Sequence, residues 1–117
     1  MLKSATLRVQ TTSLASAGSV DSHPVRLGPS AWTETGLTWA NRPAEPSPVT
    51  VVGTVKGATK VGSRYSTALT ASAIGRFAGR NLNLTVRDSA SDSLWFWSRS
   101  VTTASQRPTL TLVYGAP

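Results

Sequence analysis

The sequence predicts an all-β protein, an antiparallel two-sheet β-sandwich that is jelly-roll-like, with one short helix near residues 70–79. Ser and Thr make up 32 of the 117 residues, a composition that favours strands with hydroxyl-rich outer faces. Apolar and polar residues alternate in several short segments separated by Gly, Pro and Ser, which is typical of antiparallel strands joined by turns. Since 117 residues fit one domain, we expect residues 1–117 to form a single sandwich.

The first half of the chain supplies three expected strands and one long loop. The strands are residues 4–11, 23–27 and 50–55. In the first of them Ala5, Leu7 and Val9 share a face, which predicts a half-buried strand. Residues 30–48 contain three closely spaced prolines, which exclude a helix or a central strand there and predict an ordered loop.

The second half supplies the helix and the remaining strands. Thr70 can cap a helix that Gly79 ends, and Ala73, Ile74 and Phe77 lie on one of its faces. The expected strands are residues 62–69, 81–88, 94–100 and 109–114, with a turn at residues 89–93. Their expected inward residues are Leu82, Leu84 and Val86, and then Leu110, Leu112 and Tyr114.

The first strand is fully patterned within a few residues of Met1 and looks like the middle of a sheet. We therefore expect that the chain lacks the first strands of the full domain. The first residues alternate and show no apolar run of a signal peptide, so a signal for export would lie upstream. No apolar run approaches the ~18–20 residues that a membrane span needs.

Several kinds of chemistry are excluded or disfavoured by composition. The absence of cysteine excludes disulfides, thiolate catalysis and cysteine-based metal sites. One histidine cannot form a histidine cluster, and the sequence has no phosphate-binding or dinucleotide-binding glycine motif. Asp88 and Asp92 flank a turn, where aspartates usually bond their own backbone. We expect no enzyme and no cofactor; a structural calcium ion is compatible with a sandwich but is not indicated.

The charge balance favours an anionic partner. Twelve Lys and Arg face five Asp and Glu, a net charge of +7, and nine of the twelve cations are Arg. Nucleic acid is disfavoured because the cations are dispersed along the chain and no nucleic-acid-binding motif is present.

Residues 94–100 are the most informative segment. A strand there cannot bury all its aromatic residues, and one register places Trp95, Trp97 and Arg99 in a row on the outer face. Indoles stack on sugar rings and arginines pair with carboxylates. The alternatives are that both tryptophans are buried or cover a missing strand, and that Arg99 is a structural cap that pairs with Glu34 or Asp88. The candidate ligand-binding residues are Trp95, Trp97, Arg99, Arg87, Arg8 and Arg42.

The tryptophans of the long loop have a structural interpretation. Glu34 and Arg42 bracket a segment that Pro43 ends, and they could pair to close it. Trp32 and Trp39 would then pack beneath the loop. We favour this role over direct ligand contact, because a long ordered loop needs internal anchors.

Four segments together resemble the DNRLRE domain, which is related to family 96 of the carbohydrate-binding modules. They are Trp32-Thr33-Glu34-Thr35-Gly36-Leu37-Thr38-Trp39-Ala40-Asn41-Arg42-Pro43, Phe96-Trp97-Ser98-Arg99, Arg107-Pro108-Thr109-Leu110-Thr111-Leu112-Val113-Tyr114 and Lys3-Ser4-Ala5-Thr6-Leu7-Arg8-Val9. The resemblance implies a non-catalytic jelly-roll-like sandwich, appended to secreted bacterial polysaccharide-active enzymes or surface proteins, with alginate as the ligand of characterised relatives. Ser100 stands where the family commonly has Glu.

Two functions follow as expectations. The first is a carbohydrate-binding module for an acidic, uronate-containing polysaccharide, within a larger secreted protein. The second is a structural spacer or adhesion module of a bacterial surface protein, with neighbouring domains as its partners and no ligand of its own.

Overall fold

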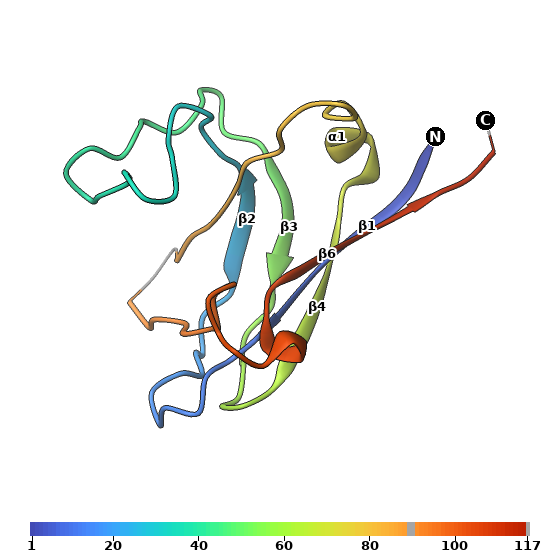
Figure 1. Ribbon diagram of the computed structural model, residues 1–117. Coiled ribbons are helices and arrows are strands. Elements are labelled where there is room, and N and C mark those ends of the chain that lie inside the picture. The colour runs from blue at the N-terminus through green and yellow to red at the C-terminus, as the bar shows by residue number, and fades with distance from the viewer. Residues whose placement is uncertain (89–90, 117) are drawn as a thin grey trace.

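The computed structural model describes residues 1–88 and 91–116 and shows two antiparallel three-stranded sheets (Figure 1). In chain order the elements are β1 (Leu2–Gln10), β2 (His23–Leu27), β3 (Val51–Val55), β4 (Arg64–Leu69), α1 (Ala71–Gly75), β5 (Leu84–Val86), the 3₁₀ turn η1 (Ala104–Gln106) and β6 (Thr109–Tyr114). The sheets are ordered β4-β1-β6 and β3-β2-β5. The predicted antiparallel two-sheet sandwich is confirmed, and β1 is indeed the central strand of its sheet.

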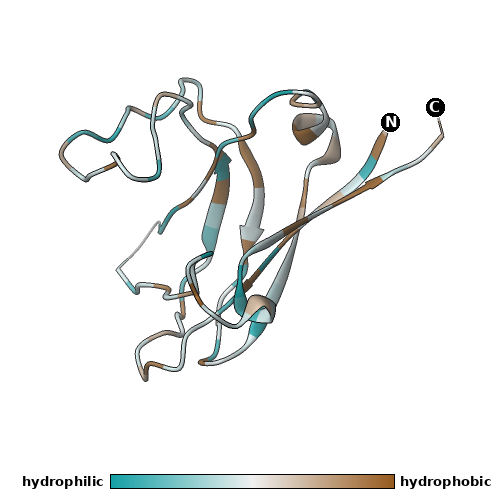
Figure 2. Ribbon diagram, in the orientation of Figure 1, coloured by the Kyte–Doolittle hydropathy of each residue, from teal (hydrophilic) through white to brown (hydrophobic). Residues whose placement is uncertain are grey.

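The core lies between the sheets and under α1. Its buried side chains are Ala5, Val25, Val52, Val55, Leu69, Ala73 and Ile74. Leu82, Leu84 and Val86 pack against this cluster, as their alternation predicts, although the ladder itself is only three residues long. Figure 2 shows hydrophobic stretches on β3 and α1, the elements that close the core.

The helix is shorter than predicted. α1 covers Ala71–Gly75, and the chain continues as a turn until Gly79, whose φ of +74° ends it. Thr70 occupies the N-cap position, but its hydroxyl donates to the Val52 carbonyl at 3.3 Å instead of capping the helix. The Thr70 backbone N–H donates to the same carbonyl at 2.8 Å, so this residue fixes the helix to β3.

The predicted strand at residues 94–100 is wrong. Only Phe96 forms a bridge, with Thr11, at the point where β1 has already ended. Backbone hydrogen bonds hold the segment there. The Thr12 N–H donates to the Trp95 carbonyl, the Trp95 N–H to the Ala17 carbonyl, and the Trp97 N–H to the Gln10 carbonyl. The chain turns away at residues 99–100. The predicted turn at residues 89–93 lies partly outside the described residues, because residues 89 and 90 are not described.

The predicted burial of β6 is also wrong. Leu110, Leu112 and Tyr114 are 37%, 38% and 58% exposed. The register pairs Leu112 with Ala5 and Leu110 with Leu7, so these side chains do share the core-facing side of the sheet. They stay exposed because the second sheet meets the first along β3 and β4, at the edge opposite to β6.

The meeting of β3 and β4 generates the first prediction. A Cβ at Gly53 would lie 2.8 Å from both the Ala68 carbonyl oxygen and the Leu69 Cδ2. Gly53→Ala should therefore lower the free energy of unfolding by about 1–3 kcal/mol, the usual cost of overpacking.

Gly75→Ala is the matched control. A Cβ at Gly75 would lie 3.6 Å from the nearest atom, which belongs to Leu2, and alanine is favoured over glycine in a helix by about 0.5–1 kcal/mol. Urea and thermal unfolding of the two variants should move in opposite directions. Equal stability of Gly53→Ala and the unchanged protein would contradict the close approach of the two strands.

Candidate functional site

A groove of about 630 Å³ lies between the long loop and the edge strand β5. Its lining residues are Gly28, Pro29, Trp32, Leu37, Trp39, Arg42, Pro43, Ala44, Glu45, Asn83, Leu84, Thr85, Val86, Arg87 and Asp88. The groove combines two tryptophans, two arginines and two carboxylates. Polar and aromatic side chains converge here, which makes the groove the candidate site.

Glu45 fixes the loop to the second sheet. One of its carboxylate oxygens accepts a bond from Arg26 at 3.0 Å and lies 3.2 Å from Arg87, and the other accepts a bond from the Thr85 hydroxyl at 3.1 Å. Arg26 and Thr85 are cross-strand partners on β2 and β5. The three partners therefore project from the outer face of this sheet, and a single loop carboxylate joins them.

The surroundings of Glu45 keep it ionised. Its side chain is only 19% exposed, and this burial favours the neutral acid. The hydrogen bonds from Thr85 and Arg26 and the charge of Arg87 outweigh the burial and lower the pKa of Glu45 below its ordinary value. Glu45 thus offsets one of the two positive charges on Arg26 and Arg87.

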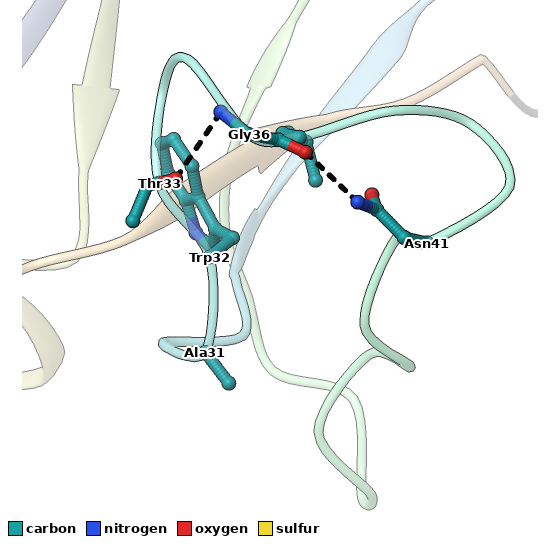
Figure 3. Close-up of a pocket in the computed structure, with 6 residues that line it drawn as sticks. Ala31, Trp32, Thr33, Gly36 and Asn41 are labelled. Atoms are coloured by element: carbon teal, nitrogen blue, oxygen red, sulfur yellow. Dashed lines mark hydrogen bonds between the residues drawn. The ribbon is translucent and has the colours of Figure 1, made fainter.

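The tip of the loop is held by its own polar groups. The Asn41 side chain donates to the Gly36 carbonyl at 2.8 Å and accepts from the Thr38 N–H at 2.6 Å, and the Thr33 hydroxyl accepts from the Gly36 N–H at 3.2 Å. Figure 3 shows Thr33, Gly36 and Asn41 beside a smaller cavity of about 320 Å³, together with the ring of Trp32. Trp32 also anchors the loop, because its indole N–H donates to the Pro29 carbonyl at 2.8 Å. Asn41 is therefore an internal anchor of the loop beside Trp32.

Trp39 does not pack beneath the loop. Its side chain is 78% exposed, and the Arg42 guanidinium carbon lies 3.5 Å from the centroid of the ring. Arg42 also donates to the Trp39 carbonyl. This arrangement is a cation–π pair at the mouth of the groove, and it leaves the rest of the indole open to solvent. Among residues 1–88 and 91–116, Arg42 has no carboxylate partner.

The predicted pairing of Glu34 with Arg42 is wrong, because Glu34 pairs with Arg99, as the alternative structural role of Arg99 predicts. Arg99 donates two hydrogen bonds to the carboxylate, one of them at 2.7 Å, in a bidentate arrangement. The bonds from Arg99 lower the pKa of Glu34. Both side chains are largely exposed, so the pair is screened by water and orients the loop more than it stabilises the fold.

The six predicted ligand-binding residues do not come together. Arg42 and Arg87 line the groove, and Arg99 is tied to the loop that forms it. Arg8 lies on the outer face of the other sheet, beside Thr109. Since the outer faces of a sandwich point in opposite directions, Arg8 and Arg87 cannot share one site.

Trp95 and Trp97 lie beside the end of β1 rather than in the groove. Trp95 is 52% exposed and Trp97 is partly buried, so they are neither a buried pair nor two members of an outward row. Their role in binding stays a prediction.

Two residues of the site were missed by sequence reasoning, Glu45 in the groove and Asn41 at the smaller cavity. Glu45 stands between prolines in the loop. The only sequence feature that could have pointed to it is that the chain has just five acidic residues. Asn41 carried no signal beyond the known preference of Asn for turns.

The described part of the chain offers no cluster of three metal-ligating side chains. Within residues 1–88 and 91–116, no helix has the length and apolar character to cross a bilayer.

The pKa of Glu45 generates the second prediction. Because the folded state lowers this pKa, the ion cluster contributes its full stability above the ordinary value and loses it as the pH falls below about 4.5. Glu45→Gln should therefore destabilise the protein by about 1–2 kcal/mol at pH 7, and the difference should shrink at lower pH.

Thermal unfolding between pH 3 and pH 7 measures this difference. Glu34→Gln removes the same charge from a solvent-exposed pair and serves as the control, with a smaller expected effect at every pH. If the loss of stability in Glu45→Gln did not change with pH, the lowered pKa of Glu45 would be contradicted.

Comparison of the chain with models of protein families, with curated proteins and with solved structures finds no match. The fold and the groove therefore rest on the residues of this chain, and the resemblance to the DNRLRE domain stays a prediction.

Proposed function

We propose that this protein is a non-catalytic module that binds an acidic, uronate-containing polysaccharide in the groove between the loop and β5. The observation that carries the proposal is the Trp39–Arg42 pair at the mouth of that groove. An exposed indole is a platform for the apolar face of a sugar ring, and a guanidinium without a carboxylate partner can bind the carboxylate of that sugar.

Arg42 is better suited to this role than the other arginines near the groove. Arg26 and Arg87 share Glu45, and Arg99 is bidentate with Glu34. Arg42 uses one donor on a backbone carbonyl, and its remaining donors are available. Its stacking on Trp39 holds it in place, so little rotamer freedom is lost when a ligand binds.

The charge of the whole chain supports an anionic ligand. The net charge is +7, and several of the twelve cations lie outside the strands, among them Lys56, Lys60, Arg76 and Arg80. The positive electrostatic potential of these cations raises the association rate with any polyanion and gives no specificity for one polyanion over another. The resemblance of the Trp32-to-Pro43 block to the DNRLRE domain supports a polysaccharide, together with a secreted bacterial protein and neighbouring domains.

The third prediction is retardation of the protein in native gels that contain alginate or pectate, and not in gels with a neutral glucan. Trp39→Ala should raise the dissociation constant obtained from this retardation at least about tenfold, which corresponds to about 1.4 kcal/mol of binding free energy. This substitution leaves the charge unchanged, so its effect separates the contribution of the Trp39–Arg42 pair from the general attraction of a basic protein.

Matched variants locate the site. Trp95→Ala removes a tryptophan outside the groove, and Arg76→Ala removes an exposed cation far from the loop in sequence, as a control for Arg42→Ala. We expect Trp39→Ala and Arg42→Ala to lose binding while the two controls keep it. Loss only with Trp95→Ala would move the site to residues 94–97. Absence of retardation in both acidic gels would refute the proposal and favour the spacer function, and equal retardation by DNA would point to unspecific polyanion binding.

A further inference from the structure

The outer edge of β6 is an open edge of its sheet. β6 pairs with β1 on one side, and among the described residues no backbone hydrogen bond leaves it on the other side. Figure 1 shows β6 running beside β1 past α1, so that both termini lie at one end of the molecule. Unpaired N–H and C=O groups along six residues are a template for another strand.

This edge lacks the features that usually protect an edge strand. The sequence of β6 is Thr-Leu-Thr-Leu-Val-Tyr, with no charged residue and no proline. The irregularity in this ladder lies on β1, between Leu2 and Ser4, and leaves the outer side of β6 extended. The core-facing side of β6 is apolar and exposed through Leu110, Leu112 and Tyr114.

We propose that β6 pairs with β6 of a second copy of this chain, antiparallel and centred on Leu112. A two-fold axis perpendicular to the sheet at Leu112 places Leu110 of one copy opposite Tyr114 of the other. The two exposed apolar stripes then join on the same side of one continuous six-stranded sheet, ordered β4-β1-β6-β6-β1-β4. The strand is thus complementary to itself both in hydrogen bonding and in the position of its apolar side chains.

The charge distribution permits this contact and predicts its salt dependence. β6 carries no charge, so no like charges oppose each other directly across the axis. The net charge of +7 on each copy still repels at long range. Self-association should therefore strengthen as salt is added, in contrast to the binding of a polyanion, which salt weakens.

Sedimentation velocity over a concentration series is the first test. The unchanged protein should show a monomer–dimer equilibrium, and Leu112→Lys should weaken it at least about tenfold because two like charges would face each other at the axis. Val20→Lys adds the same charge at an exposed loop residue and should associate like the unchanged protein. Circular dichroism shows whether each variant is folded. A monomer at every concentration, or a dimer that Leu112→Lys leaves intact, would overturn the proposal.

Disulfide trapping tests the register, and because the covalent product accumulates it detects even a weakly populated dimer. The chain has no cysteine, so a single introduced cysteine reports on its own position. Directly opposed residues on antiparallel strands lie about 4.5–5.5 Å apart between Cα atoms, within disulfide range. Leu112→Cys should form a covalent dimer on oxidation, and Val20→Cys should not. Trapping by Val113→Cys in preference to Leu112→Cys would overturn the register centred on Leu112.

Discussion

The ion cluster at Glu45 decides where the long loop lies, and the candidate site exists only because the loop lies there. Residues 30–48 contain no helix and no strand, so no ladder of backbone bonds holds them to the sheets. A single carboxylate joins the loop to Arg26 on β2 and to Thr85 on β5. Because the carboxylate is mostly buried, its charge is screened little by water and its geometry is exacting. Glu45 thereby holds the Trp39–Arg42 pair of the loop across the groove from β5, whose residues line the other side.

The alternation of apolar and polar residues was sufficient to predict where most strands lie and which of their residues share a face. β1 has the period-two pattern of a central strand, and the structure places it between β4 and β6. Alternation fails at β6, where the pattern gives the correct side of the sheet but the wrong burial. The side to which a residue points is a property of its own strand, whereas burial requires another layer above it, and the second sheet covers β4 instead.

The candidate site was predictable only in its residue types, because its contacts join distant parts of the chain. Glu34 has a cation eight positions away at Arg42 and another 65 positions away at Arg99, and it binds the distant one. Sequence spacing favours the near partner, since loop closure over a short segment costs less entropy. The near partner is engaged by the indole of Trp39, a competitor that charge counting ignores. The hydrogen bonds of Asn41 hold the loop tip from within, which frees the tryptophan from the structural role that its hydrophobicity suggested.

The groove and the open edge belong to different sheets, and this separation has a consequence for binding. The groove lies over β5, at the edge of the β3-β2-β5 sheet, whereas β6 ends the other sheet. Pairing through β6 would therefore leave both grooves open and relate them by a two-fold axis. A polysaccharide repeats its binding unit along the chain, so one molecule can reach two grooves. The second contact is then intramolecular and raises the overall affinity without any new contact in either groove, provided that the polymer spans the distance between them. A weak site with one indole and one available guanidinium would gain most from such an arrangement.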